Sequence, residues 1–233
     1  MSKVAIVTGA SQGIGAATVA AYRKLGWSVV ANSRSITPSD DPGVLAVAGD
    51  VADPAVGRRI VDAGLEQFGR IDTVINNAGV FIAKPFTEYT LEDYEAITSI
   101  NLRGFLTVTQ PAVEAMLQTG GGHVVTITTS LAEQANSSLI SSLASLTKGG
   151  LNSATKALAI EYAGRNVRFN AVAPGVIRTP MHSPETYEYM AATHPVNRMG
   201  DVSDITDAIV YLENAPFVTG EILHVDGGQT AGH

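Results

Sequence analysis

The sequence of 233 residues contains no cysteine and is short of positive charge. Without cysteine the chain can form no disulfide, no thiolate nucleophile and no thiolate metal site, and we expect no metal centre of another kind. Its 15 Lys and Arg against 22 Asp and Glu give a formal net charge of −7. Proteins that bind nucleic acid concentrate cationic side chains to neutralise phosphate, so the charge balance argues against a nucleic-acid partner.

Long apolar runs, linkers and repeats are missing as well. The apolar runs have the length of strands and fall well short of the roughly 20 residues that a membrane-spanning helix needs, so we expect no membrane partner. No segment rich in Pro, Gly or Ser divides the chain, and we expect one domain over residues 1–233. The first apolar run begins at Val4, which leaves no room for a signal or transit peptide and predicts a cytoplasmic location.

Short β-branched runs alternate with stretches long enough for helices. This pattern predicts an α/β fold of the doubly wound Rossmann type, with a mostly parallel seven-stranded sheet and helices on both faces. Strands are expected at 4–7, 29–31, 44–47, 73–75, 123–128, 167–172 and 222–225. Helices are expected at 16–25, 55–68, 91–117, 141–162 and 202–212.

The segment 178–200 contains three prolines and lies between the sixth and seventh predicted strands. We expect a loop with a short helix in this segment. A mobile lid and a static surface loop are both compatible with this composition.

A glycine-rich turn joins the first predicted strand to the first predicted helix. Residues 8–15 read Thr-Gly-Ala-Ser-Gln-Gly-Ile-Gly. Gly9 suits the turn, Gly13 allows the backbone to approach a pyrophosphate, and Gly15 allows strand and helix to pack closely. The helix N-terminus then presents N–H groups and a partial positive charge. The pattern favours a dinucleotide site over its alternative, a plain strand-to-helix turn.

Several further motifs follow in order along the chain. They are residues 8–15, Asp50 and Val51, residues 76–79, Asn101, residues 128–130, residues 148–150, residues 174–179 and residues 225–228. In this order and spacing the chain resembles the short-chain dehydrogenase/reductase family over nearly its whole length. The resemblance implies hydride transfer between a nicotinamide cofactor and a small carbonyl or alcohol, in a homotetramer or homodimer.

The resemblance also implies a set of cofactor-binding residues. They are Gly9, Ser11, Gln12, Gly13, Ile14, Gly15, Ser33, Arg34, Asp50, Val51, Asn77, Ala78, Gly79, Lys148, Pro174, Gly175, Ile177 and Thr179. Asp50 would accept from the adenine amino group, while the backbone of Ile177 and the hydroxyl of Thr179 would lie near the carboxamide. Two alternatives stay open: an aspartate that caps the next helix, a task that Asp53 could also take, and an Asn77 that caps nearby backbone.

The end of the second predicted strand bears on the choice of cofactor. An acidic residue there would bind a ribose 2′-hydroxyl and repel a 2′-phosphate, but the sequence reads Asn32, Ser33, Arg34. The Arg34 guanidinium offers a planar set of donors that suits phosphate, and Ser33 adds a neutral donor. We therefore predict a preference for NADP(H), with NAD(H) possible. The alternative is an Arg34 that only stacks on adenine or faces solvent.

Four residues are implied to carry the chemistry: Asn101, Thr129, Ser130 and Lys148. Lys148 would bind the nicotinamide ribose and stabilise negative charge on the reacting oxygen. Thr129 stands where the family has a serine that polarises the carbonyl. The family's tyrosine, four residues before the lysine, is replaced here by Ala144.

The missing tyrosine leaves three hypotheses. In the first, the proton comes from water on Lys148 or from one of the nearby hydroxyls, which belong to Thr129, Ser130, Ser141 and Ser142. In the second, His182 or His194 of the substrate loop is the acid. In the third, the protein binds NADP(H) without turnover, as a sensor or an assembly subunit.

Overall fold

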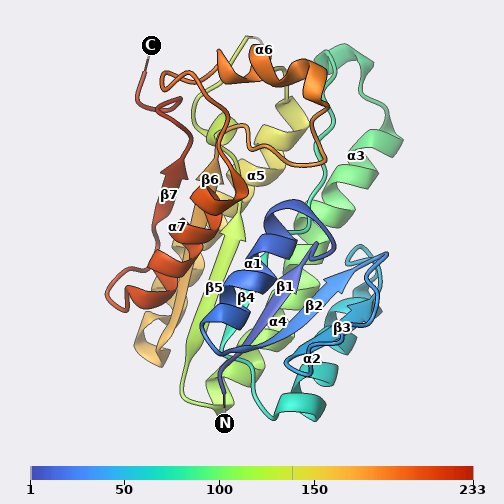
Figure 1. Cartoon of the computed structure of the whole chain (residues 1–233), viewed down its shortest axis with the longest axis vertical. Helices are drawn as coiled ribbons and strands as arrows, with labels where there is room; N and C mark the ends of the chain where they lie inside the picture. Colours follow the sequence, from blue (N-terminus) through green and yellow to red (C-terminus); the bar gives the residue numbers. More distant parts are fainter. Residues whose placement is uncertain (1, 138, 233) are drawn as a thin grey trace.

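Seven strands pair side by side in one sheet in the computed structural model, which describes residues 2–137 and 139–232 (Figure 1). They are β1 (Val4–Thr8), β2 (Ser28–Ser33), β3 (Val44–Ala48), β4 (Thr73–Asn76), β5 (Gly122–Ile127), β6 (Val167–Pro174) and β7 (Ile222–Val225). Their order is β3-β2-β1-β4-β5-β6-β7, and every neighbouring pair is parallel. The predicted Rossmann-type fold is confirmed. The sheet is fully rather than mostly parallel, because each connection between consecutive described strands is a crossover that returns the chain to the same edge.

Helices connect the strands. The longer ones are α1 (Gly13–Lys24), α2 (Pro54–Phe68), α3 (Leu91–Thr98), α4 (Gly104–Gln118), α5 (Ser142–Tyr162), α6 (Tyr187–Ala191) and α7 (Val202–Asn214). Single-turn elements are η1 (Phe86–Glu88), η2 (Ser99–Arg103), η3 (Ser130–Ala132), η4 (Ala163–Arg165) and η5 (Pro184–Thr186). The prediction of one continuous helix over 91–117 was wrong in one respect, because a π-helical turn, η2, separates α3 from α4. Such turns are rare and concentrate at functional sites.

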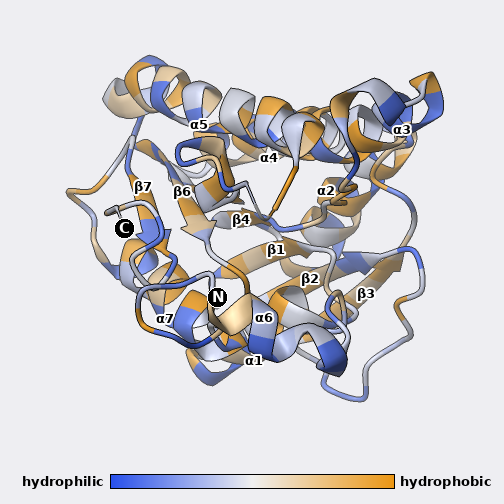
Figure 2. Ribbon diagram, turned by 90° about the horizontal axis from the view of Figure 1, so that it is seen from above, coloured by the Kyte–Doolittle hydropathy of each residue, from blue (hydrophilic) through white to orange (hydrophobic). Residues whose placement is uncertain are grey.

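The helices form two layers, one on each face of the sheet. Seen from above, α2, α4 and α5 cover one face, and α1 and α7 cover the other (Figure 2). Side chains of β1 alternate between the layers: Val4 and Ile6 belong to the core beneath α2, α4 and α5, and Ala5 and Val7 to the core beneath α1 and α7. Burial on both faces explains why the strands read as continuous apolar runs.

The start of α2 decides between the two aspartates near the end of β3. The Asp53 side chain accepts from the Ala55 N–H at 3.0 Å and caps the helix, and Pro54 occupies its first turn. The Asp50 side chain accepts from the Ala52 N–H at 3.0 Å, one turn earlier. Asp50 therefore does not cap α2.

The segment between β6 and α7 crosses the top of the molecule and contains η5 and α6 (Figure 1). The short helix expected in this segment is present. The two ends of this segment lie side by side, because Ile177 and Gly200 form a parallel β-bridge.

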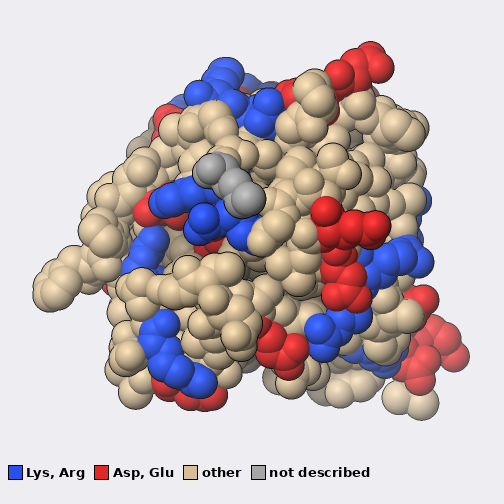
Figure 3. Space-filling model, turned by 90° about the horizontal axis from the view of Figure 1, so that it is seen from below, with Lys and Arg blue, Asp and Glu red and all other residues tan. Residues whose placement is uncertain are grey.

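The surface at the amino ends of the strands carries both signs of charge, with Lys and Arg lying among Asp and Glu (Figure 3). Within residues 2–137 and 139–232, no helix combines the length and the apolar character needed to cross a membrane.

A buried polar network lies near this lower end of the sheet, centred on the Glu213 carboxylate of α7. One of its oxygens accepts from the hydroxyls of Tyr22 at 2.8 Å and Thr73 at 2.9 Å. It also lies 3.2 Å from Nδ1 of His123. These donors hold the pKa of Glu213 below its usual value against the effect of burial.

The protonation state of His123 follows from its other neighbour. The Asn170 oxygen accepts from the Glu221 N–H at 3.0 Å, which turns the Asn170 amide nitrogen toward Nε2 of His123, also at 3.0 Å. Nε2 therefore carries no proton, and Nδ1–H donates to Glu213. Burial lowers the pKa of His123 and stabilises this neutral form.

We predict that acid destabilises the fold through His123. An unfolded histidine takes up its proton near pH 6.5, whereas the folded one takes it up only at lower pH. The stability is therefore fully present above about pH 6.5 and is lost as the pH falls below it, at up to about 1.4 kcal/mol per pH unit for one proton. Urea unfolding between pH 8 and 5 measures this. His123→Gln is expected to flatten the profile, and parallel profiles for the two proteins would contradict the assignment.

Candidate functional site

The predicted site residues gather at the carboxyl edge of the sheet, where ligands bind in open α/β folds. The turn after β1, the end of β2 and the residues after β4 form one half of this edge. The ends of β5 and β6 and the first turns of α5 form the other half.

The turn between β1 and α1 is held by very close backbone contacts. Gly9 and Gly13 have φ values of +66° and +56°, which L side chains rarely adopt. A Cβ on Gly15 would lie 2.2 Å from the Gly9 carbonyl oxygen, so only glycine fits there. The Asn77 amide donates to the carbonyls of Thr8 at 2.9 Å and Gly9 at 3.2 Å. Asn77 thus caps nearby backbone and joins the end of β4 to the turn.

The N-terminus of α1 has no side-chain cap. Gln12 is the N-cap residue and makes no capping hydrogen bond, and the first turn contains no acidic residue. Ser11 and Gln12 are exposed, while Ile14 packs against the core. A Cβ on Gly13 would lie 3.4 Å from the Thr179 side chain, so the turn faces the segment after β6. Within the described part of the chain no side chain caps the first N–H groups of α1, so they can bind an anion between these two segments.

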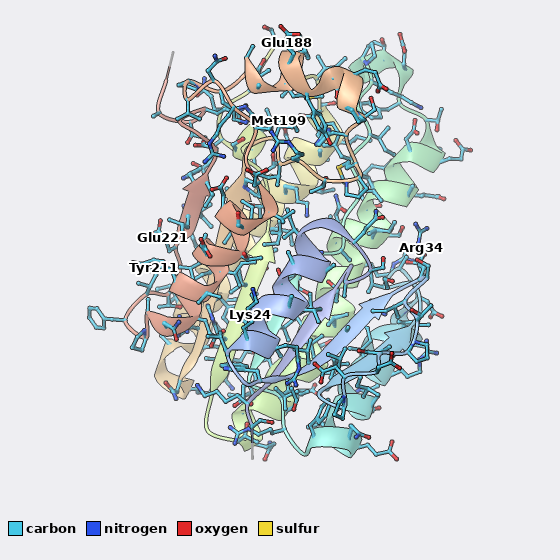
Figure 4. All side chains as sticks on the ribbon, viewed as in Figure 1. Lys24, Arg34, Glu188, Met199, Tyr211 and Glu221 are labelled. Carbon is cyan, nitrogen blue, oxygen red and sulfur yellow. The ribbon has the colours of Figure 1, made fainter. Side chains whose placement is uncertain are left out.

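The end of β2 contains two polar atoms without a partner among the described residues. The Asn32 amide donates to the carbonyls of Val47 at 2.9 Å and Gly49 at 3.1 Å, which leaves its buried oxygen unpaired. The hydroxyl of Ser33 is also buried and unpaired. Arg34 follows with an exposed side chain at the carboxyl end of the strand (Figure 4). Buried polar groups left unpaired in this way indicate a place for a missing partner.

The two residues predicted beside the adenine, Asp50 and Val51, differ in solvent exposure. Val51 is 5% exposed and packs against the backbone of Gly104. Asp50 is more accessible, but its carboxylate already accepts from Ala52.

Lys148 projects from α5 toward the end of β5. Its Nζ donates to the Ile127 carbonyl at 2.7 Å. Burial lowers the pKa of Lys148 to about 8. A Cβ on Gly79 would lie 3.1 Å from this Nζ and 3.2 Å from Oδ1 of Asn101, so these three residues converge. Ala78, Asn101 and Lys148 line one small cavity, which is described below.

Asn101 lies in the π-helical turn and is 2% exposed. Its side chain accepts from the Val80 N–H at 3.0 Å and donates to the Val80 carbonyl and the Thr147 hydroxyl, both at 3.2 Å. The side chain therefore secures the chain after β4 to α5, and its amide oxygen keeps one further lone pair for another contact.

A small cavity lies between these elements, with a volume of about 10 Å³. This is near the smallest volume that can hold one water molecule. Its lining includes Asn76, Asn101, Thr126 and Lys148, which supply polar partners for such a water.

The residue one helical turn before Lys148 is Ala144. It is 2% exposed and belongs to an apolar cluster with Ile97 and Leu143. The side chains of Val80 and Tyr89 pack against the same cluster. No hydroxyl therefore projects from this position of α5.

The two hydroxyls after β5 differ in what they can do. Ser130 is 1% exposed and donates to the Gln229 side chain at 2.9 Å. Thr129 accepts from the Leu131 N–H at 3.3 Å and keeps its own proton available. Of the pair, Thr129 can donate to an added oxygen, whereas Ser130 is committed to the C-terminal segment. The sequence contains no signal for the Ser130–Gln229 contact, because the two residues lie 99 positions apart.

The segment that starts at Pro174 is anchored on both sides. The Gly175 N–H donates to the Val225 carbonyl at 3.1 Å, and the Val176 N–H donates to Nε2 of His194 at 2.9 Å. The partnership of His194 with this segment was not predicted. Its cause is the fold of residues 178–200, which returns the chain to its own starting point.

The two loop histidines suggested as acids lie in different surroundings. His194 is 4% exposed, and both of its ring nitrogens contact backbone, so it has no proton directed at the site. His182 is partly exposed, and burial lowers its pKa, which keeps it mostly neutral at pH 7.

The chain is similar to known proteins over nearly its whole length. A family model described as enoyl-(acyl carrier protein) reductase matches residues 9–230. The 3-oxoacyl-(acyl-carrier-protein) reductase of Thermotoga maritima is 33% identical, with 97% of each chain covered. The solved structure of ElxO with NADP bound has a TM-score of 0.93 and 26% identity, with 100% of each chain covered. The 3-ketoacyl-(acyl-carrier-protein) reductase of Brucella melitensis, complexed with NADH, has a TM-score of 0.88 and 29% identity, with 98% of each chain covered.

We predict that Gly15→Ala destabilises the fold by roughly 1–3 kcal/mol, because its Cβ must displace the Gly9 carbonyl from 2.2 Å. Gly164→Ala is the matched control: a Cβ there meets nothing within 4 Å, and its effect should stay within about 0.5 kcal/mol. Urea unfolding measures both. Equal stability of the two variants would show that the turn is not tightly packed.

Proposed function

The chain belongs to the short-chain dehydrogenase/reductase family, and we propose that it is an NADP(H)-dependent oxidoreductase that acts on a small carbonyl or alcohol. One observation carries the proposal. The uncapped N-terminus of α1 and the half-buried side chain of Lys148 lie at the same edge of the sheet, connected through residues 77–79. This edge therefore combines an anion site with a cation suited to a developing alkoxide.

The residues at this edge fit a dinucleotide phosphate. The N–H groups of α1 and the bare Gly13 backbone would hold the pyrophosphate. The unpaired Ser33 hydroxyl and the exposed Arg34 would hold a 2′-phosphate. Along the same edge we assign Asp50 and Val51 to the adenine, residues 77–79 and Lys148 to the riboses, and Ile177 and Thr179 to the carboxamide. The bound cofactor supplies or accepts the hydride.

The preference for NADP(H) rests on Arg34 and on the missing acid at the end of β2. The ElxO structure holds NADP and the Brucella reductase structure holds NADH, so the fold accommodates both. A carboxylate would disfavour a 2′-phosphate, and none of Asn32, Ser33 and Arg34 has one.

We predict that Arg34→Ala weakens NADPH binding by about tenfold to a hundredfold, the range expected when a hydrogen bond to a charged group is lost. NADH, which has no 2′-phosphate, should lose less than twofold. Titrating the two dinucleotides by the quenching of intrinsic fluorescence measures this. Equal losses for both would mean that Arg34 only stacks on the adenine or faces solvent.

The proton for carbonyl reduction must come from a group other than a tyrosine on α5, because Ala144 occupies that position. We assign it to water held at Lys148, with the Thr129 hydroxyl donating to the substrate oxygen. Lys148 has a pKa of about 8, so at neutral pH it is mostly protonated and can stabilise negative charge on that oxygen. The nearby cavity has room for one water between Asn101 and Lys148.

The sizes of the separate contributions to catalysis favour a slow enzyme over an inert one. A positioned general acid contributes about 10²–10⁴-fold to a rate, whereas orientation of the reactants contributes roughly 7–11 kcal/mol. Loss of the tyrosine therefore leaves most of the rate enhancement in place.

The second candidate function is an NADP(H)-binding protein without turnover, acting as a sensor or an assembly subunit. The observation that favours it is the environment of Ala144, which is closed by apolar side chains. Tyr89 packs against this cluster, but its hydroxyl donates to the Ile82 carbonyl at 2.7 Å. The residues that bind the cofactor would then function without a catalytic site beside them.

We also propose a homotetramer or homodimer. The outward faces of the two long helices bear Leu106, Leu146 and Ile160, which are 57%, 61% and 82% exposed. Apolar side chains so exposed on adjacent helices favour contact with a second copy. One domain over 1–233, a substrate loop at 178–200 and a cytoplasmic location remain predictions from the sequence.

We predict that the protein oxidises NADPH with at least one member of a panel of ketones, aldehydes and quinones. Lys148→Met should abolish this turnover, and the wild-type rate of reduction should fall as the pH rises through about 8, because the neutral amine cannot stabilise the alkoxide. Steady-state absorbance at saturating NADPH measures both. Tight NADPH binding without turnover would favour the second candidate.

A further inference from the structure

We propose that His194 is a positioning residue, which fixes the Val176 peptide and thereby aims the peptide groups of Ile177 at the nicotinamide carboxamide. The inference rests on the proposed function, since it concerns how this chain holds the cofactor. It gives a role to a buried imidazole that the chemistry itself does not use.

The contacts of His194 define a single state of its ring. The backbone N–H of Val176 donates to Nε2 at 2.9 Å, so Nε2 carries no proton. The other nitrogen, Nδ1, then carries the proton and lies 3.0 Å from the Met190 carbonyl at the end of α6. Two backbone groups thus hold a neutral imidazole between α6 and the segment after β6.

The Val176 peptide is held from its other side by Gly200. The Gly200 N–H donates to the Val176 carbonyl at 3.0 Å, and the Arg178 N–H donates to the Gly200 carbonyl at 2.8 Å. In such a parallel bridge the N–H and C=O of the residue in between, Ile177, point to the opposite side of the segment. None of the described residues hydrogen-bonds to them, so they remain available to an amide ligand.

Gly175 makes room for the imidazole. A Cβ at this position would lie 2.7 Å from Nε2 of His194 and 2.9 Å from the Gln229 side-chain oxygen. Gln229 in turn donates to the carbonyl of Thr193 at 3.2 Å and accepts from Ser130 at 2.9 Å. The backbone next to His194 is therefore tied, through Gln229, to the segment that follows β5 as well.

The consequence is a link between the substrate loop and the recognition of one end of the cofactor. The imidazole acts on the carboxamide only through the Val176 and Ile177 peptides. The 2′-phosphate position at Arg34 involves none of these contacts, and the α1 turn faces this segment at Thr179, two residues beyond Ile177. A change at His194 is therefore expected to affect the nicotinamide end most.

The test compares two ligands that differ at that end. Calorimetry with NADPH and with 2′-phospho-ADP-ribose, which lacks the nicotinamide, is carried out on the wild type, His194→Phe and His194→Gln. His194→Phe removes the acceptor and should weaken NADPH about fivefold to tenfold, with less than a twofold change for 2′-phospho-ADP-ribose. His194→Gln keeps a side-chain acceptor and should recover most of the NADPH affinity. If the phenylalanine variant does not fold, His194→Ala removes the acceptor without adding volume.

Equal weakening of both ligands by His194→Phe would overturn the inference, because it would show a general structural role. No change in either ligand would overturn it too. If the wild type binds neither ligand, the proposed function itself fails, and that result is distinct from a selective loss in the variants.

Discussion

The rest of the site depends on the contact between α1 and the Gly9 carbonyl. The helix approaches so closely that a Cβ on Gly15 would lie 2.2 Å from that oxygen. The same turn receives the Asn77 amide, which connects it to the end of β4. Two residues further on, Gly79 lies against the Lys148 ammonium. A short series of close contacts therefore determines how far the helix N-terminus stands from the lysine.

The site consists of two halves that can change independently. The first half, from the ends of β1, β2 and β4, offers backbone donors, an unpaired hydroxyl and Arg34, all suited to phosphates. The second half, from β5, β6 and α5, offers Lys148, Thr129 and the segment after Pro174. Ala144 belongs to the second half, on α5. The groups suited to phosphates lie outside that half, so the two functions proposed for the chain share the same first half.

Much of the fold could be predicted from the sequence, because strands buried on both faces leave continuous apolar runs. The glycine turn and the absence of an acid at the end of β2 could also be predicted, because each is a pattern of neighbouring residues in the sequence. The π-helical turn at Asn101 was not, since its cause lies in contacts with Val80 and Thr147 from other elements. The difference between Ser130 and Thr129 depends on Gln229, which is distant in the chain. The ring state of His194 likewise depends on backbone groups that only the folded segment brings together.

Every role proposed for this edge of the sheet requires the β1–α1 turn to bind the diphosphate of a reduced dinucleotide phosphate. Calorimetric titration of the folded wild-type protein with NADPH measures this binding. We expect saturable heat with one NADPH bound per chain. Absence of any heat with either reduced dinucleotide, from protein that unfolds cooperatively, would contradict it.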